Sequence, residues 1–409
     1  FECNESAPPS RPMARLTRDQ FDNTLRDLLI EYIGEERARR VLDEHGPQHT
    51  LLPDDEAPPR PNNRFKFDYR RWDQTVSEVH VEGWYETALA IGTELAANHR
   101  DALLGGCGET LACAEEFLRD FAARAFRHPV PPGTWARIRS ALGDTPTPTA
   151  LGETIAFVLL APDFLYHVEE GAEAVGGDTY RLSDHELAAR MSYALWDSIP
   201  DRELWELAEA GRLSADAAVL QEQVDRMLAH PRSRPALTRF FEDWLQLVSA
   251  ADPSRAVEAP GYADFAGDDL PSPALQEAGR QEIRDLVATL LASEEATVAD
   301  LLTTDLATVR DPELAALYGL EEPWDGEGEP PRFPAGERPG VLTRFSILAS
   351  ATVRTRPVWR GVLIREMILC DTIPPPPEGA SSAELDVGDE LLSTREYYER
   401  LTQQPGTSC

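Results

Sequence analysis

The sequence predicts an all-α protein built from several packed helical subdomains that are joined by proline- and acid-rich loops. Apolar residues recur at helical spacing along most of the 409 residues, whereas the alternating pattern of a strand is scarce. Two segments also carry the signature of a capped helix start. We find no internal repeat of fixed period, and the length suits roughly two to four folding units.

The two clearest helix starts share the capping-box pattern. Thr17 can cap a helix while Gln20 reaches back to the capping residue, and an apolar face continues to Leu29. Ser183 and Glu186 repeat this arrangement before a second apolar face. Both segments are therefore predicted to begin amphipathic helices.

Further helices are expected where apolar residues recur at helical spacing and the pattern stops at a glycine or proline. They cover 71–100, 113–127, 150–166, 201–210, 217–228, 235–248, 273–292, 342–351, 358–370 and 393–402. The segment 150–166 is apolar nearly all round, so we expect it near the centre of the fold. Short strand pairings are conceivable near 77–81 and Tyr180.

Proline- and acid-rich loops divide these helices into groups. The loops lie at 52–63, 143–148, 252–273 and 321–339, and the run 374–377 predicts a stiff polyproline spacer. The chain is therefore predicted to form four helical domains, at 1–104, 105–175, 176–305 and 306–409. The loops 252–273 and 321–339 are long for a compact domain, so we expect them to carry function or ligand contacts.

The charge balance excludes some partners. The chain has 72 acidic and 39 basic residues, a formal net charge of −33, and Lys66 is its only lysine. A surface with this much negative charge repels phosphate backbones and anionic lipids. Nucleic-acid binding is therefore not expected. The negative charge is expected to keep the protein soluble. The alternative is that it attracts cations or a basic partner. No apolar run reaches the ~20 residues that cross a bilayer, so no transmembrane segment is predicted.

The five cysteines are Cys3, Cys107, Cys113, Cys370 and Cys409. Cys107 and Cys113 close a short loop of residues that turn easily. That spacing suits a local disulfide in an oxidising compartment. The alternative is a pair of unrelated buried thiols. An odd cysteine is left over in either case.

Histidine patterns give no metal site. His185 and Glu186 begin an H-E-x-x-H motif, but alanine occupies the position of the second histidine. His45 and His49 have helical spacing, but the Gly-Pro between them argues against a helix. We expect His128 to be a capping or hydrogen-bonded core side chain rather than a ligand.

The same interpretation applies to His167, which also ends an aromatic helix. Glu78, His80 and Glu82 alternate in sequence, and a solvated helix face is the favoured interpretation over a converging site.

Other chemistry receives little support. The sequence lacks a G-x-S-x-G elbow and a phosphate-binding glycine loop. Acidic clusters at 264–269 and 325–329 could hold calcium through oxygen ligands, although neither matches an EF-hand loop. No catalytic residue stands out, so the sequence assigns no reaction.

Several segments together resemble a large bacterial family known mainly from planctomycetes and myxobacteria. Its members consist of serial domains of unknown function, often linked to Planctomycete cytochrome c-type domains. The resemblance lies in RLTRDQFDNTLRDLL (15–29), FAARAFRHPV (121–130), LLAPDFLYHVE (159–169), the segment 182–213, ELAALYGL (313–320), GVLTRFSILAS (340–350) and RPVWRGVLIREMILCDTIPPPP (356–377). These segments occur in the family's order and span nearly the whole chain.

The resemblance extends to the tail, 395–409. The family follows its proline run with R-x-x-x-E-x-H-x-x-x-P-x-C-x-x-C-H, which makes Cys409 the first cysteine of a C-x-x-C-H element. Such an element attaches haem c through two thioethers. This chain has Leu401 at the position of the family's first histidine and a longer spacing from Pro405 to the cysteine. A Cys409 without that element would instead form a disulfide. The resemblance also supports pairing of Cys3 with Cys370.

The resemblance implies an exported protein, in the periplasm, at the outer-membrane surface or outside the cell. It would belong to a c-type cytochrome or redox system and dock a protein partner or an extracellular substrate. The alternative is an extracellular structural or binding module without redox activity. Hydrolysis of an extracellular polymer by paired carboxylates ranks last, because no pair stands out.

Several residues in the matched segments are expected to be structural. Arg26 and Asp27 should form ion pairs at a helix end or between helices, and Trp196 and Trp244 should lie in the core. Arg360, together with Gly361 beside it, should belong to a helix start that packs against a neighbour.

Overall fold

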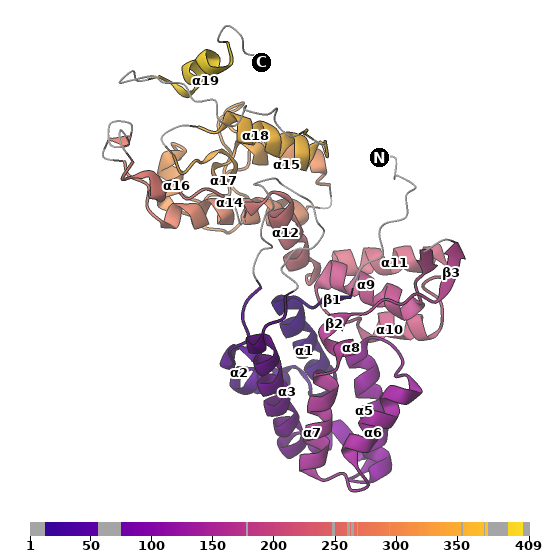
Figure 1. Cartoon of the computed structure of the whole chain (residues 1–409). Coiled ribbons are helices and arrows are strands. Elements are labelled where there is room, and N and C mark those ends of the chain that lie inside the picture. The colour runs from indigo at the N-terminus through magenta and orange to yellow at the C-terminus, as the bar shows by residue number, and fades with distance from the viewer. Residues whose placement is uncertain are drawn as a thin grey trace. The chain divides into compact units, whose positions relative to one another are not determined.

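The computed structural model describes residues 13–55, 75–176, 179–247, 250–259, 262, 266–267, 269–293, 295–352, 355–371, 373–374 and 392–403. These residues form helices and two small two-stranded sheets (Figure 1), which confirms the predicted mostly helical class. The chain divides into two compact units. The N-terminal unit holds the described residues up to Ala236, and the C-terminal unit holds those from Leu237 onward.

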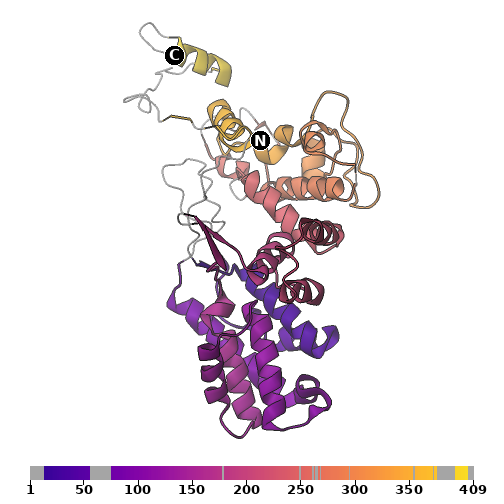
Figure 2. The same ribbon diagram turned by 90° about the vertical axis from the view of Figure 1, so that its right-hand side faces the viewer.

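The N-terminal unit consists of helices that pack side by side, with two short strand pairs at their ends (Figure 2). Its elements are β1 (Ala14–Arg15), α1 (Arg18–Ile33), α2 (Glu35–His45), η1 (Pro47–His49), α3 (Glu78–Asn98), α4 (Arg100–Leu104), η3 (Gly105–Cys107), α5 (Leu111–Phe126), α6 (Pro132–Leu142), α7 (Pro148–Leu159), α8 (Pro162–Leu165), β2 (Tyr166–His167), β3 (Glu173–Gly176), β4 (Thr179–Arg181), α9 (Asp184–Trp196), α10 (Arg202–Glu209), α11 (Ala217–Ala229) and the start of α12 (Ser233–Trp244).

Both predicted capping boxes are confirmed. The amide of Gln20 donates to Thr17 Oγ1 at 3.1 Å, and the amide of Thr17 donates to Gln20 Oε1 at 3.2 Å. At α9, the amide of Glu186 donates to Ser183 Oγ, and the amide of Ser183 donates to Glu186 Oε2. Each box satisfies two backbone donors that the first helical turn leaves unpaired.

One hydrophobic core holds most of the N-terminal unit together. Leu28 of α1, Ile91 of α3, Leu118 of α5 and Ile155 of α7 are each fully buried in it. The predicted segments 1–104 and 105–175 therefore both contribute to this one core. A second cluster joins α9, α10 and α11 through residues that include Trp196, which is only 5% exposed as expected.

Helices α3 and α7 approach each other closely at two glycines. A Cβ on Gly92 would lie 2.3 Å from the carbonyl oxygen of Gly152, and a Cβ on Gly152 would lie 2.8 Å from the carbonyl oxygen of Gly92. In each case the obstacle is backbone, which cannot rotate away as a flexible side chain can. The missing side chains therefore set the distance between these two helices.

Replacing Gly92 with alanine is expected to destabilise the N-terminal unit by about 1–3 kcal/mol, because the added methyl group overpacks the α3–α7 contact. In an open helix the same change usually stabilises by up to about 1 kcal/mol. Gly133 in α6 supplies that matched control, because no atom lies within 4 Å of the position that its Cβ would take. Urea denaturation of both variants checks the expectation. Equal stabilities for Gly92→Ala and Gly133→Ala would contradict it.

The C-terminal unit is built around the long helix α14. Its elements are the end of α12, η5 (Pro253–Ala256), α14 (Ala274–Leu291), α15 (Val298–Thr303), α16 (Pro312–Leu317), η6 (Val341–Thr343), α17 (Phe345–Leu348), α18 (Pro357–Leu363), η7 (Ile364–Ile368) and α19 (Thr394–Thr402). Leu286 of α14 belongs to a core with Leu245 and Met367, whereas Leu275 belongs to a second core with Val309 and Phe333. Trp244 was expected in the core; it is half-buried, packs against the first core and donates to the carbonyl of Met367.

The structure departs from the predicted elements in a few places. The helix expected at 150–166 ends at Leu159 and restarts at Pro162, because a proline lacks the amide that would continue the first helix. Residues 77–81 are the helical start of α3, but the expected pairing near Tyr180 is found in the β3–β4 hairpin. The helix expected at 342–351 is only the short α17, preceded by η6.

Other differences concern single turns and short helices. The helix expected at 358–370 changes to a π-helical turn at η7. The sequence did not predict helices α2, α4, α6, α15 and α16. No helix within the described ranges is both long and apolar enough to cross a bilayer.

Candidate functional site

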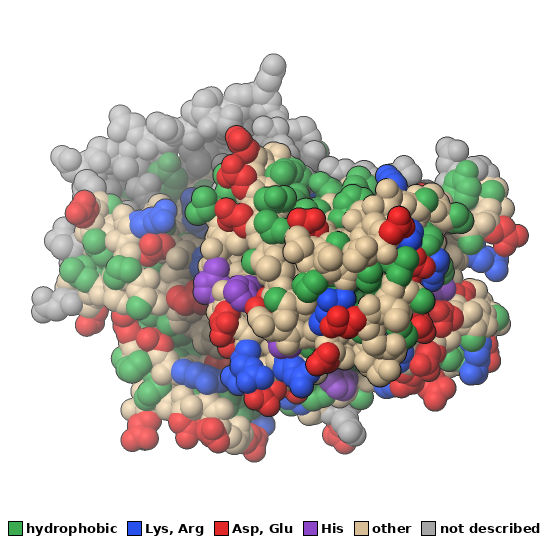
Figure 3. Space-filling model, turned by 90° about the horizontal axis from the view of Figure 1, so that it is seen from below, with side chains coloured by type: hydrophobic (Ala, Val, Ile, Leu, Met, Phe, Trp, Pro, Cys, Tyr) green, Lys and Arg blue, Asp and Glu red, His purple; other side chains and the backbone are tan. Residues whose placement is uncertain are grey.

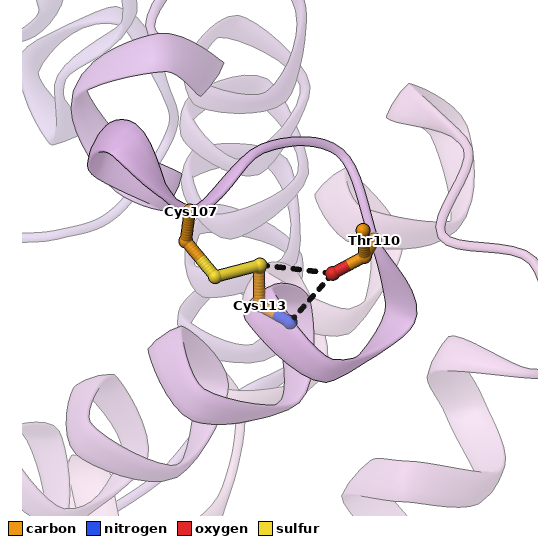
Figure 4. The surroundings of a disulfide bond; sticks show 3 residues. All are labelled: Cys107, Thr110 and Cys113. Atoms are coloured by element: carbon orange, nitrogen blue, oxygen red, sulfur yellow. Dashed lines mark hydrogen bonds between the residues drawn. A yellow bond between two sulfur atoms is a disulfide. The ribbon is translucent and has the colours of Figure 1, made fainter.

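Cys107 and Cys113 form a disulfide, as their spacing predicted (Figure 4). Their Cα atoms are 5.8 Å apart, and the bond joins η3 to the first turn of α5. Thr110 caps α5 between them. The amide of Cys113 donates to Thr110 Oγ1 at 3.2 Å, and the Thr110 hydroxyl donates to Cys113 Sγ at 2.9 Å.

The other cysteine predictions fall mostly on residues that the structure does not describe. Cys370 is exposed, forms no disulfide with another of the described residues, and has a positive φ of 55°. Cys3 and Cys409 lie outside the described residues. Pairing of Cys3 with Cys370 and haem attachment at Cys409 therefore stay predictions.

Arg127 links three elements of the N-terminal unit. It ends α5 in the left-handed region, with a φ of 64°. Its guanidinium donates to the carbonyls of Asp163, Phe164 and Tyr166 around α8, and to Tyr193 Oη on α9 at 3.1 Å. The side chain is 4% exposed, so these bonds satisfy a charge that water cannot reach.

Helix α1 joins the same network through its polar residues. The hydroxyl groups of Thr24 and Tyr193 are hydrogen-bonded at 2.6 Å. Asp27 accepts a hydrogen bond from Ser198, and it forms ion pairs with Arg26 and Arg232. The prediction of an ion pair at a helix end or between helices is confirmed for Asp27, which reaches Arg232 before α12, whereas the pair of Arg26 with Asp27 lies within α1.

Arg124 forms a buried ion pair in this unit, with 1% of its surface exposed. It donates from Nε and Nη2 to both carboxylate oxygens of Glu31 on α1, and to the carbonyl of Pro200 at 2.6 Å. Its guanidinium lies 4.8 Å from the centre of the Trp205 ring. Arg202 also pairs with Glu31 at the surface.

These bonds connect four of the segments that carried the sequence resemblance, 15–29, 121–130, 159–169 and 182–213. Their polar residues contact one another and backbone carbonyls, which fixes α1, α5, α8 and α9 in one arrangement. Buried polar networks whose members are bonded specify a single packing. We therefore interpret these motif residues as structural rather than catalytic.

A second buried network lies in the C-terminal unit. Glu282 on α14 is 1% exposed, and Tyr318 Oη donates to its Oε2 at 2.8 Å. Arg344 is fully buried, and its Nη1 lies 3.5 Å from Glu282 Oε1. The amide of Phe345 donates to Tyr318 Oη at 2.6 Å.

Arg344 completes its hydrogen bonds with backbone carbonyls. It donates to Gly340, Leu306 and Thr304 at 3.2, 2.9 and 3.3 Å. It therefore ties the segment before α17 to the chain after α15. Arg360 makes a comparable bond to the carbonyl of Leu348, as expected for a helix start that packs against a neighbour.

Burial dominates the protonation of this second network. It raises the pKa of Glu282 to about 7, although Arg344 and the Tyr318 hydroxyl favour the charged form. Burial also lowers the pKa of Arg344, and it raises that of Tyr318, with the Glu282 charge adding to the rise. The Glu282 carboxyl group therefore loses its proton near neutral pH.

An open groove of about 740 Å³ lies beside this network, and it is lined by α14, α15 and the loop 328–339. The loop belongs to 321–339, which was expected to carry ligand contacts. Arg338 lines the groove and packs over the Tyr318 ring at 4.1 Å. Arg332 pairs there with Asp305, so both signs of charge face the groove.

His128 and His167 have hydrogen-bond partners, as predicted. His128 Nε2 lies 3.2 Å from Asp163 Oδ1, and Nδ1 lies 2.9 Å from the carbonyl of Pro129. Burial opposes its charged form, but these two bonds outweigh burial and raise the pKa of His128. His167 Nε2 contacts Gln20 Oε1 at 3.2 Å.

Of the remaining histidines, His45 and His99 lie 3.6 and 3.5 Å from the Glu94 carboxylate, and the described residues hold no metal-binding group there. Helix α2 ends at His45, and His49 lies in η1, so the expected break between them is confirmed. His80 lies half-buried in the first turn of α3, where its Nδ1 accepts from the amide of Ser77 at 3.3 Å, whereas Glu78 and Glu82 are exposed. His185 packs edge-on against Trp205 at 4.7 Å, and burial lowers its pKa.

The calcium prediction stays untested. Within the part of the chain that the structure describes, no three His, Cys, Asp or Glu side chains gather to hold a metal ion. Asp325 accepts instead from the amide of Glu327 at 2.8 Å. In the other cluster, 264–269, Asp264 and Asp268 lie outside the described residues.

Arginine residues also pair with acidic ones nearer the surface. On the face shown in Figure 3, acidic and basic side chains are interspersed among apolar ones. Arg139 with Glu115 and Arg190 with Glu169 are examples of such pairs. Such pairs reduce the repulsion around individual carboxylates, but the net charge of −33 stays the same because it already counts every arginine.

The sequence-based interpretation missed the buried charges Arg124, Glu282 and Arg344. A signal was available for the first, because Arg124 follows Phe117 and Phe121 on the same buried stripe of α5. Glu282 likewise lies on the buried stripe of α14, between Gly279 and the apolar residues that follow. A charge on a core-facing stripe predicts a buried partner.

Comparisons with known proteins match two parts of the chain. Residues 182–320 match the family model PSD4, described as a protein of unknown function (DUF1592). Residues 338–409 match PSCyt3, described as a protein of unknown function (DUF1588). No curated protein and no solved structure matches. The two matches together cover just over half of the sequence, in the order that the resemblance implied. The chain therefore contains two of the serial domains of unknown function that are associated with Planctomycete cytochrome c.

Proposed function

We propose that this chain is the helical body of an exported protein in a c-type cytochrome system. The match of residues 338–409 to PSCyt3 carries the proposal, because that domain is named for its cytochrome association. The disulfide between Cys107 and Cys113 supports export, since such bonds persist in oxidising compartments. The proposed location is the periplasm, the outer-membrane surface or the extracellular space.

The body would position a partner or a substrate rather than react with it. Support comes from the two buried networks, in which Arg124 and Arg344 each bond to segments far apart in sequence. Such networks hold helices in one arrangement, as a docking surface requires. The net charge of −33 would favour a basic partner and speed its encounter.

The described residues do not fit a covalently attached haem. Thioether attachment needs a C-x-x-C pair followed by histidine. Cys107 and Cys113 are bonded to each other, and Asp371 follows Cys370. The proposal therefore assigns haem attachment to the segment around Cys409, which lies outside the described residues.

The test uses the natively produced protein and its Cys409→Ala variant. The native protein should absorb at about 410 nm and stain for haem after denaturing electrophoresis, because thioethers survive denaturation. Cys409→Ala should lose the covalent stain, whereas the matched control Cys370→Ala should keep it. A native protein without absorption and without stain would overturn the haem assignment.

The groove in the C-terminal unit favours a second candidate, an extracellular binding module without redox activity. A groove of about 740 Å³ lined by Arg332, Arg338 and Asp305 is large enough for a small polar ligand. The same spectrum distinguishes the two functions, because a binding module has no haem absorption. Under this second function, Arg338→Ala would weaken ligand binding and leave the fold intact.

A further inference from the structure

We propose that the disulfide between Cys107 and Cys113 is a thiol–disulfide exchange site, at which Cys107 is attacked and Cys113 leaves. The two sulfur-bearing residues differ in exposure. Cys107 is exposed in η3, whereas Cys113 is 4% exposed at the start of α5. An attacking thiolate must approach along the axis of the bond, so it reaches the exposed sulfur first.

The surroundings of Cys113 favour its departure as a thiolate. Cys113 is the third residue after the cap Thr110, in the first turn of α5, where the positive end of the helix favours negative charge. The Thr110 hydroxyl already donates to Cys113 Sγ at 2.9 Å, as Figure 4 shows. A sulfur that is a better leaving group speeds exchange. The neighbouring acidic residue Glu109 forms an ion pair with Arg100, with Oε2 and Nη1 3.8 Å apart.

The loop that carries Cys107 can open without disturbing the core. Gly105 and Gly108 have positive φ values of 56° and 91°, and no atom lies within 4 Å of the place where a side chain would be. Residues 105–110 are all exposed. Cys107 is exposed, whereas Cys113 is buried next to Ala114, which belongs to the hydrophobic core. Reduction would therefore release the loop and leave the packed helices in place.

The chemistry needs a partner with two thiols, which we take to be a cysteine pair of an exported protein. One partner thiolate attacks Cys107 Sγ, the bond to Cys113 breaks, and Cys113 leaves with the electron pair as a thiolate. The partner's second thiolate then attacks its own first sulfur and releases Cys107. The partner pair is oxidised to a disulfide, and this chain gains two electrons and becomes a dithiol. The exposed loop gives a protein-sized partner access to Cys107.

The test measures reduction of the native full chain by glutathione, with acid quenching and peptide mapping. We expect reduction without denaturant, and the transient mixed disulfide on Cys107. Thr110→Ala should slow reduction by about five- to tenfold, because the leaving thiolate loses its hydrogen bond. Thr110→Ser should restore the wild-type rate.

Thr147→Ala is the matched control, because Thr147 caps α7 in the same manner but its hydroxyl accepts from the amide of Ala150 rather than from a cysteine. This variant should lose a cap and keep the wild-type reduction rate. Glutathione attached to Cys113, or reduction that requires a denaturant, would overturn the proposal. Equal slowing by Thr110→Ala and Thr147→Ala would also overturn it, since it would show a stability effect only.

Discussion

Replacing Arg124 with methionine should lower the free energy of unfolding of the N-terminal unit by about 3 kcal/mol, the low end for breaking a buried ion pair. The low end applies because Glu31 keeps its surface partner Arg202. The change removes the buried donor from Glu31 and leaves the carbonyl of Pro200 without its partner. Hydrogen exchange of the α5 amides reports this unit alone.

Arg40→Met is the matched control for this prediction. Arg40 pairs with Glu36 on α2, but 60% of its side chain is exposed. Exposed pairs contribute at most about 1 kcal/mol, so the control should unfold almost as the wild type does. If Arg124→Met matched this control, the network of motif residues would not be what holds the unit together.

Glu282 should make the C-terminal unit less stable as the pH rises toward neutrality. Its pKa is raised from 4.5 to about 7 in the folded state, mainly by burial. Between these values the folded state holds a proton that the unfolded chain releases. The stabilising contribution is therefore complete below pH 4.5 and is lost as the pH rises through 7.

The measurement compares wild type with Glu282→Gln across this range, because the amide cannot titrate. The stability of wild type relative to the variant should fall by about 3 kcal/mol from pH 4 to pH 8. Glu337→Gln, an exposed position in the same unit, should follow the wild-type curve. A constant difference between wild type and Glu282→Gln at all pH values would contradict the raised pKa.

Features that depend on a few neighbouring residues could be predicted from the sequence. The caps at Thr17 and Ser183 follow from side chains that bond to amides three residues away. The disulfide between Cys107 and Cys113 likewise needs only a short loop. In each case the local chain contains both partners, so the pattern determines the contact.

Features that depend on tertiary contacts could not be predicted. The partners of Arg127 are carbonyls near α8, and nothing in its own segment identifies them. Glu282 and Arg344 are 62 residues apart, and only the packing of α14 against α17 brings them together. The segment around Cys409, on which the haem prediction rests, lies outside the described residues.

The central claim is that this chain belongs to an exported c-type cytochrome system. Its most direct test is the mass of the intact protein, purified from its native source and denatured without reduction. We predict a mass that exceeds the polypeptide by at least one covalently bound haem, together with a Soret band. A mass equal to the polypeptide less the hydrogens lost in its disulfides, with no visible absorption, would contradict the claim and favour a binding module.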